Sequence, residues 1–341
     1  MLKKLMAAGL VAGFALSPFA ASAQDVTLKL HQLLPLRATI PAGFLTPWIE
    51  KVEKESGGRI KVEHYPSMQL GGKPPQLVQQ ATDGVVDMVW TVMGYTPGRF
   101  PRAEAFELPF MVTNAEASSR AFQEYAEKNR KDDFPGLKVI AVHTHGPGLI
   151  HSKEPVNKLE DLKGMKLRGP TRVITNMLGA LGAVPVGMPV PAVPEAVSKG
   201  VIDGAAIPWE VTLPLKMSEL VQNHTGFTGT HGLYTATFLF AMNEASYNKL
   251  PADLKKVIDD NSGVEAAAWA GRAMEAGDAV GLKKATAAGN NIVTLDAAET
   301  KRWDDASKSV VTDWIAEMKE KGIDGAMLIK DAQALIAKNT K

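Results

Sequence analysis

The sequence predicts an α/β protein in which mainly parallel sheets are covered by helices. Short β-branched runs alternate with longer amphipathic runs along most of the chain, and such strand–helix alternation is typical of parallel sheets. The chain has 341 residues, and at roughly 150 residues per domain this length predicts two domains. Hydrophobic residues make up 45% and charged residues 22%, which is typical of a globular protein rather than a disordered or fibrous one.

In the first half of the chain, local signals mark where the expected elements begin and end. A helix is expected from Pro41, which fits a first turn, to Glu55, and Gly57-Gly58 ends it. Asn114 is expected to cap a helix running towards Lys131, because its side chain can accept a hydrogen bond from the free amides of the first turn. The other elements expected here are strands over 26–31, 59–65, 85–91 and 137–143 and a helix over 74–82.

The second half repeats this alternation and then changes character at Leu250-Pro251. From there a helical pattern continues to about Ala288, although it contains four glycines. So long a helix cannot pack on one small domain alone, and we expect it to run across two domains as a brace. A further helix is expected over 296–321, and the tail from Ala332 is expected to be helical but weakly anchored. Before the long helix we expect strands over 165–168 and 201–207 and helices over 172–181 and 193–199.

The N-terminus carries the pattern of an export signal. Lys3 and Lys4 precede an apolar run over 5–16, Pro18 breaks the run, and Ala21-Ser22-Ala23 provides small residues for signal peptidase. The alternative is a membrane anchor, but the run is shorter than the roughly 20 residues that span a bilayer. We expect residues 1–23 to be a signal peptide that is cleaved after Ala23.

Charge and composition exclude several classes of function. The chain has a net charge of +1, and removing residues 1–23 would take away two lysines and no acid, leaving −1. Such a balance does not support nucleic-acid binding or a basic membrane surface. Cysteine is absent, so thiolate catalysis, thiolate metal sites and disulfides are excluded. The best later apolar run, Leu233 to Met242, is too short to cross a membrane.

Signatures of catalysis are missing. The sequence contains no Gly-x-Ser-x-Gly elbow and no His-Glu-x-x-His helix, and Pro74 follows Gly72-Lys73 where a phosphate loop needs Ser or Thr. His143 and His145 are alternate residues of an expected strand, so they would share a face and could share a cation. Without cysteine or a suitably spaced acid beside them, we favour an ordinary strand end, and we expect no metal and no cofactor.

Two residues at expected strand ends are candidate ligand contacts. Arg168 ends a strand at Gly169-Pro170 and precedes a helix, and open α/β sheets bind ligands at that edge. Its alternative role is that of a surface arginine paired with an acid. Trp209 follows the strand over 201–207, where it could fill the core or stack on a ligand.

A series of short blocks resembles the solute-binding subunit (DctP type) of tripartite ATP-independent periplasmic (TRAP) transporters. The resemblance covers nearly all of the chain after residue 23, and it depends on the order and spacing of the blocks. These are Tyr65 to Gly72, Asp83 to Met88, Phe106 to Phe110, Leu162 to Arg168, Gly200 to Gly204 and the Leu250-Pro251 start of the long helix.

The resemblance implies the fold of a two-domain periplasmic-binding-protein clamp (type II-like) with a long helix bridging both domains. We expect domain I over 24–145 plus 235–273 and domain II over 146–234 plus 274–341, with the bridging helix over about 251–288. It also implies a monomer in the periplasm that is not an enzyme and that delivers an organic acid to small and large membrane subunits of the DctQ and DctM type. Two alternatives remain, a binding protein of an ATP-driven importer and a periplasmic hydrolase or isomerase that uses His143 and His145.

The resemblance also assigns the binding residues. In this family an arginine at the position of Arg168 holds the ligand carboxylate, a task that suits the two parallel donors of a guanidinium. Many members carry Asn where this chain has Ile207, and sialic-acid-binding members carry Arg near Gly148, so the pocket should hold one carboxylate and an apolar or aromatic body. Segments that line the cleft in the family hold Trp90, Tyr95 and Trp209, and further candidate polar contacts are His31, Gln32, Thr171 and Glu210.

Overall fold

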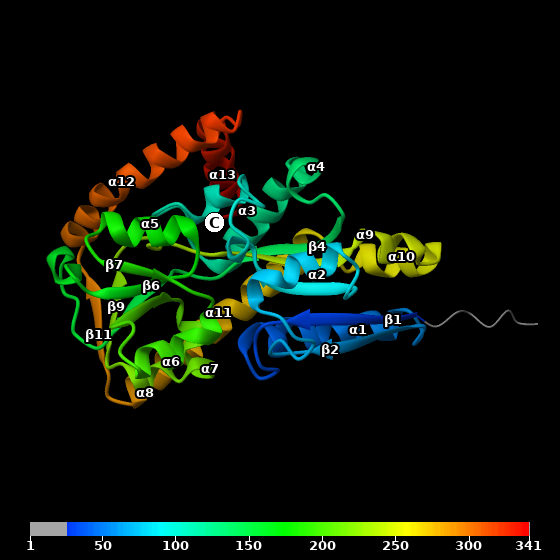
Figure 1. Ribbon diagram of the computed structural model, residues 1–341, viewed down its shortest axis with the longest axis horizontal. Helices are drawn as coiled ribbons and strands as arrows, with labels where there is room; N and C mark the ends of the chain where they lie inside the picture. Colours follow the sequence, from blue (N-terminus) through cyan, green and yellow to red (C-terminus); the bar gives the residue numbers. More distant parts are fainter. Residues whose placement is uncertain (1–25, 341) are drawn as a thin grey trace, which may run out of the picture.

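The computed structural model describes residues 26–340 as a mixed α/β protein with two separate sheets (Figure 1). In each sheet one strand runs opposite to all the others. The predicted α/β class is therefore confirmed, and both sheets are mainly parallel. The expected domain limits remain a prediction.

The first sheet has five strands in the order β2-β1-β3-β10-β4, and β10 is the reversed strand. Every residue of β3 and of β10 is buried, because these strands lie inside the sheet and helices cover it. Helix α1 packs on β2, α2 on β3 and β10, and α3 on β4. The bounds are β1 Val26–Gln32, β2 Ile60–Tyr65, β3 Met88–Val92, β4 Leu137–Thr144, β10 Thr237–Asn243, α1 Thr46–Glu55, α2 Leu77–Thr82 and α3 Ala115–Lys128.

The second sheet has six strands in the order β11-β9-β5-β8-β6-β7, and β5 is the reversed strand. Helix α5 packs on β6 and β7, and α12 packs on α5. The bounds are β5 Leu149–Ser152, β6 Lys166–Gly169, β7 Val184–Gly187, β8 Gly204–Ile207, β9 Asn223–Phe227, β11 Asn291–Leu295, α5 Arg172–Ala180 and α12 Ala297–Glu320.

Short helices and helical turns connect these elements. They are α4 Arg130–Asp133, α6 Val193–Ser198, α7 Thr212–Leu215, α8 Met217–Leu220, α9 Glu244–Lys249, η1 Pro41–Leu45, η2 Pro74–Gln76, η3 Met93–Tyr95, η4 Ala103–Glu107, η5 Leu159–Leu162, η6 Val190–Ala192 and η7 Trp209–Val211. The predicted helix from Pro41 is a π-helical turn, η1, that continues into α1. The predicted Asn114 cap is confirmed, since its side chain accepts a hydrogen bond from the Ala117 amide at 2.8 Å.

The predicted single helix over 251–288 is wrong in one respect. The structure has two helices there, α10 Ala252–Asp260 and α11 Val264–Ala287. Between them Gly263 has φ +83°, a backbone conformation outside the helical region that glycine adopts without strain. The Gly263 amide donates instead to the Ile140 carbonyl of β4, at 2.8 Å.

Helix α11 nevertheless bridges the two halves of the molecule as predicted. It packs against α3, β4 and η1 beside the first sheet and against η7 and α7 beside the second. Three glycines allow these close approaches, because an added Cβ at Gly271 would collide with Ala115, at Gly277 with Thr39 and Glu210, and at Gly281 with Trp209.

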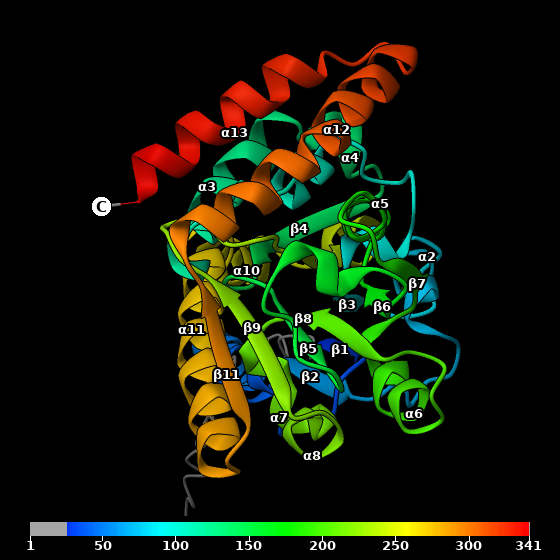
Figure 2. The ribbon, with the colours of Figure 1, turned by 90° about the vertical axis from the view of Figure 1, so that its left-hand side faces the viewer.

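The C-terminal tail is held more firmly than the sequence suggested. Helix α13 spans Gly325–Asn339, packs on α3 and α12, and buries Leu328, Ala332, Leu335 and Ile336. In Figure 2 it turns back alongside α12. The expectation of a weakly anchored tail is therefore wrong, because α13 packs on α3, which is distant in the sequence, as well as on the preceding helix α12.

The predicted signal peptide and its cleavage site lie outside the described residues. Within residues 26–340, no helix is both long enough and apolar enough to cross a membrane.

Replacing Gly271 tests the close packing of the bridging helix. An alanine Cβ at this position would lie 2.6 Å from the Ala115 carbonyl oxygen and 2.7 Å from the Glu116 Cα. We expect Gly271→Ala to lower the free energy of unfolding by about 1–3 kcal/mol, measured by urea denaturation. The matched control is Gly179→Ala in α5, where the added Cβ meets only Pro185 at 3.7 Å; it should raise stability by up to about 1 kcal/mol. Equal effects of the two substitutions would contradict the packing argument.

Candidate functional site

A cavity lies where strand ends of the two sheets meet, and it contains about 410 Å³ of empty space, part of it open to solvent. Strands β1, β3, β4, β6 and β8 contribute residues at or just beyond their carboxyl ends, and the reversed strand β10 contributes residues at its start. This is the edge at which α/β sheets bind ligands. The lining residues are Leu33, Leu34, Trp90, Val92, Tyr95, His145, Arg168, Pro170, Val190, Ile207, Pro208, Glu210, Val211, Tyr234, Ala236 and Phe238.

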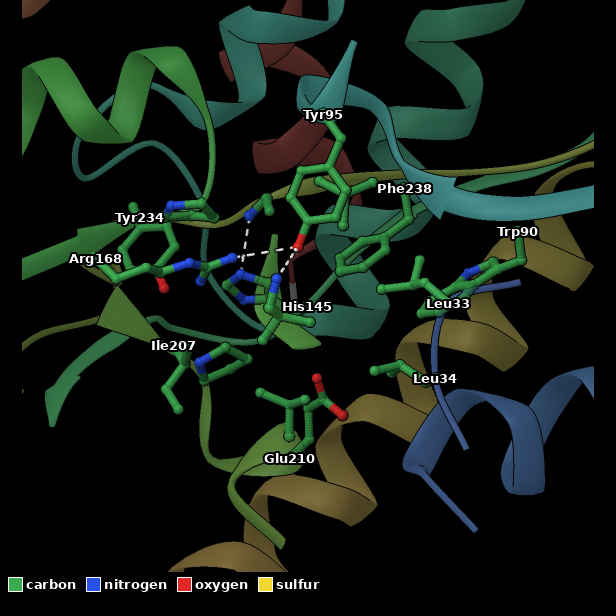
Figure 3. Close-up of a pocket in the computed structure, with 16 residues that line it drawn as sticks. Leu33, Leu34, Trp90, Tyr95, His145, Arg168, Ile207, Glu210, Tyr234 and Phe238 are labelled. Atoms are coloured by element: carbon green, nitrogen blue, oxygen red, sulfur yellow. Dashed lines mark hydrogen bonds between the residues drawn. The ribbon is translucent and has the colours of Figure 1, made fainter. Parts of the chain in front are cut away.

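Arg168 enters the cavity from the end of β6, and its guanidinium donates to the Tyr95 hydroxyl there (Figure 3). Three protein oxygens in all hold the guanidinium in place. Its Nε donates to the Met188 carbonyl at 2.9 Å, Nη1 to the Ala206 carbonyl at 3.0 Å, and Nη2 to the Tyr95 hydroxyl at 3.2 Å. A guanidinium has five N–H donors. One N–H on each terminal nitrogen therefore remains, which is the number that a carboxylate with two oxygens accepts.

Within residues 26–340, no acidic side chain forms an ion pair with this cation. Arg168 is 2% exposed, and no described Asp or Glu side chain lies within 4.0 Å of its guanidinium. Burying an unpaired charge is costly. An anion that enters the cavity would balance the charge of Arg168.

Two tyrosines stand beside Arg168 and differ in their bonding. The Tyr95 hydroxyl accepts from Arg168 and also from the Val190 amide at 2.8 Å. The Tyr234 hydroxyl is buried and has no hydrogen-bond partner among the described residues. Burial raises the pKa of both phenols, so both stay protonated at neutral pH. Tyr234 therefore keeps, near the Arg168 charge, a hydroxyl donor that no described residue uses.

His143 and His145 do not form a metal site. His145 Nε2 accepts from the Ala236 amide at 3.0 Å, and its Nδ1 donates to the Gly146 carbonyl at 2.5 Å. His143 Nε2 accepts from the Trp90 indole at 2.9 Å. Burial lowers the pKa of His143 to about 3 and of His145 to about 4, so both rings are neutral. Among residues 26–340 no group of three or more His, Asp or Glu side chains is arranged to hold a metal ion.

An aromatic wall forms the side of the cavity opposite Arg168 (Figure 3). Phe238 stacks on Trp90 with ring centroids 5.4 Å apart and on His143 at 4.8 Å. Leu33 and Leu34 extend this wall. Flat aromatic faces and leucines favour an apolar or aromatic ligand body.

Of the eight residues predicted as ligand contacts, Arg168, Trp90, Tyr95 and Glu210 line the cavity, and the other four do not. Thr171 precedes α5 without a side-chain cap bond, because its hydroxyl donates to Glu107 at 2.6 Å. Trp209 packs edge-on against His151, with ring centroids 4.9 Å apart, and thus fills the core, one of the two roles considered for it.

His31 and Gln32 are occupied by bonds near the end of β1. His31 Nδ1 pairs with Gln80 at 2.7 Å, while the Gln32 side chain bonds both the amide and the carbonyl of Leu34. Gln32 thereby shapes the turn that brings Leu34 to the cavity, and neither side chain lines it.

Tyr234 and Phe238 line the cavity but were not predicted from the sequence as ligand contacts. Both belong to the apolar run over 233–242, which was considered only for its length. The one sequence feature that could have indicated Tyr234 is its place just before a strongly apolar run. Its position beside Arg168 depends on the antiparallel strand β10, which the sequence pattern did not identify.

Fold and site together define a two-lobed α/β protein with an internal cavity that contains a buried arginine. Residues 37–318 match the family described as bacterial extracellular solute-binding protein, family 7, and the chain belongs to this family.

Solved structures of similar proteins agree with this assignment. A TRAP solute-binding protein from Rhodoferax ferrireducens, in complex with copurified benzoate, is 51% identical, with a TM-score of 0.91 over 92% of this chain and 98% of that one. A marine metagenome TRAP protein specific for aromatic acids, with 3-hydroxybenzoate, is 52% identical, with a TM-score of 0.92 over 93% and 100%. A Bordetella bronchiseptica TRAP protein with bound mandelate is 29% identical, with a TM-score of 0.85 over 93% and 100%. The predicted membership of the DctP-type TRAP family, whose members are solute-binding receptors, is thus confirmed.

A buried histidine pair behind Trp209 makes stability depend on pH. Asn290 donates to His224 Nε2 at 2.9 Å, His151 Nε2 pairs with the Ile207 carbonyl at 3.1 Å, and the two Nδ1 atoms are 2.7 Å apart. One proton between the Nδ1 atoms satisfies both neutral rings. Burial lowers the pKa of His151 to about 3 and of His224 to about 4.

Because unfolding restores a pKa near 6.5, the unfolded state binds more protons, and this contribution to stability is complete above pH 6.5 and is lost as the pH falls towards 4. His224→Asn removes one of these groups. The gap in unfolding free energy between wild type and this variant should narrow by about 2 kcal/mol from pH 7 to pH 4.5 in urea denaturation. An unchanged gap would contradict the neutral-pair assignment.

Proposed function

We propose that this protein captures an aromatic monocarboxylic acid in the periplasm and delivers it to the membrane subunits of a TRAP transporter. The observation that carries the proposal is the buried Arg168 cation, which has no acidic partner and faces a cavity whose remaining lining is mainly apolar and aromatic. The ligands of the similar proteins, namely benzoate, 3-hydroxybenzoate and mandelate, have this chemistry.

Two positions argue against more polar ligands. Ile207 lines the cavity where many family members carry Asn, so one polar partner is missing. At Gly148 an added Cβ would collide with the ring of Tyr234, so the second arginine of sialic-acid-binding members does not fit beside this tyrosine. Both features support a ligand with a single strongly held carboxylate.

The alternatives have less support. A hydrolase or isomerase would need a free nitrogen on His143 or His145. Both nitrogens of His145 and Nε2 of His143 are occupied by protein hydrogen bonds, and His143 Nδ1 lies 3.5 Å from the Thr144 carbonyl inside the core. A binding protein of an ATP-driven importer would share the architecture, but the similar structures are those of TRAP proteins. We also propose that the protein is a monomer, and that its two domains have the limits expected from the sequence.

A ligand screen tests the proposal. Benzoate, hydroxybenzoates and mandelate should raise the melting temperature, since a ligand at 100 times its Kd adds ~2.7 kcal/mol of stability, whereas succinate and sialic acid should not. Stabilisation by succinate or sialic acid alone would overturn the aromatic assignment.

Arg168→Ala tests the carboxylate anchor. Removing one partner of a buried charge pair costs roughly 2–5 kcal/mol. The Kd for the best aromatic acid, measured by calorimetry, should therefore increase by a factor between about 30 and several thousand. The matched control is Arg272→Ala on α11, where the arginine is half exposed and pairs with Glu116; its Kd should equal that of wild type. An unchanged Kd for Arg168→Ala would remove the central claim.

The two cavity tyrosines provide a matched pair of variants. Tyr234→Phe removes a hydroxyl that has no protein partner, so it should weaken binding about 3- to 10-fold without lowering the stability of the ligand-free protein. Tyr95→Phe removes a hydroxyl that accepts two protein hydrogen bonds, and it should lower that stability by about 1–3 kcal/mol in urea denaturation. Tighter or equal ligand binding by Tyr234→Phe would contradict its role as a donor.

A further inference from the structure

Glu210 places a carboxyl group in the cavity on a different side from the Arg168 guanidinium, near Leu34 (Figure 3). The residue belongs to η7, directly after β8, and is 4% exposed. An aromatic acid held at Arg168 would turn its ring towards the apolar wall, so a ring substituent can approach Glu210.

The backbone of Glu210 is fixed, while its side chain is free of ionic partners. Its amide donates to Asp278 Oδ1 at 2.8 Å, and its carbonyl accepts from the Thr39 hydroxyl at 2.9 Å. Thr39 donates its proton to this carbonyl, and its hydroxyl is also close enough to the Glu210 carboxyl to lower the pKa of that group slightly. No Lys, Arg or His among the described residues lies within 4.0 Å of that carboxyl. The Thr39 hydroxyl can occupy at most one of the two carboxyl oxygens, so the other is available to a ligand.

The surroundings keep this carboxyl neutral. Burial, with a smaller contribution from Asp278 on α11, raises the pKa of Glu210 to about 8, and burial raises the pKa of Asp278 itself to about 7. A protonated carboxyl can both donate and accept a hydrogen bond. The other polar groups that line the cavity are the Arg168 cation and neutral His145, Tyr95 and Tyr234.

We propose that Glu210 is a specificity-determining residue, whose carboxylic acid group hydrogen-bonds a hydroxyl group on the ring of an aromatic acid held at Arg168. This inference rests on the proposed function and names the ligand class within it, the hydroxylated aromatic acids. A hydroxyl fits because it is uncharged and is itself both donor and acceptor. A second ligand carboxylate would be buried without a cation, and a ligand ammonium would enter a cavity that already holds the Arg168 charge.

Calorimetric titration with benzoate and with 2-, 3- and 4-hydroxybenzoate tests the assignment at pH 7. Wild type should bind at least one hydroxybenzoate roughly three- to tenfold more tightly than benzoate, the size expected for one uncharged hydrogen bond. Glu210→Leu should bring this affinity ratio to about one. Glu210→Gln, which retains a donor and an acceptor, should keep a ratio above one.

A pH series with benzoate separates this role from a merely structural one. Ionisation of Glu210 would add a negative charge to a cavity that must accept an anion, so the wild-type Kd should rise roughly tenfold between pH 7 and pH 9. Glu210→Gln should remove most of this rise, because the glutamine side chain does not ionise. The matched control is Asp133→Asn, since burial also raises the pKa of Asp133, to about 6, but it lies on α4 outside the cavity; its profile should follow wild type.

The outcomes distinguish the two proposals. If neither benzoate nor any hydroxybenzoate binds wild type, the proposed function fails. If they bind and Glu210→Leu leaves the affinity ratio unchanged, or if isophthalate or 3-(aminomethyl)benzoate binds wild type more tightly than every hydroxybenzoate, the role of Glu210 is overturned while the proposed function stands.

Discussion

The uncompensated charge of Arg168 is the constraint on which the binding site depends. A guanidinium that is 2% exposed can be kept in a protein only if its donors are satisfied, and here two backbone carbonyls and one tyrosine hydroxyl satisfy three of the five. The two carbonyls lie beside the second sheet and Tyr95 lies just after β3 of the first. A ligand carboxylate that accepts the remaining N–H groups would therefore bind at the contact between the two halves.

Other contacts hold the halves together without the ligand. Glu107, beside the first sheet, accepts from the hydroxyl of Thr171, which precedes α5. Glu104 pairs with Arg172, the first residue of α5. A binding protein must open as well as close, so the closed and open states should differ by only a few kcal/mol.

Sequence reasoning succeeded where the signal was local. The alternation of runs gave the α/β class, Asn114 its capping role, and the break at Gly169-Pro170 placed Arg168 at a strand end. It failed where distant segments decide the outcome. The bridging helix stops and restarts at Gly263 because β4 accepts its amide, and the C-terminal helix is anchored by α3, some 200 residues earlier in the chain.

The same division applies to the site. The sequence by itself determined that an arginine would stand at the ligand-binding edge, that Asn and Arg were absent at Ile207 and Gly148, and that aromatic residues were near. Only the tertiary structure decided which neighbours face the ligand. Thr171 and Trp209 have side chains suited to ligand contacts. The Thr171 hydroxyl, however, donates to Glu107, and the Trp209 ring packs against His151 and His224. Tyr234 gains its place because β10 runs against its neighbours, and the pairing of strands far apart in sequence leaves no local signal.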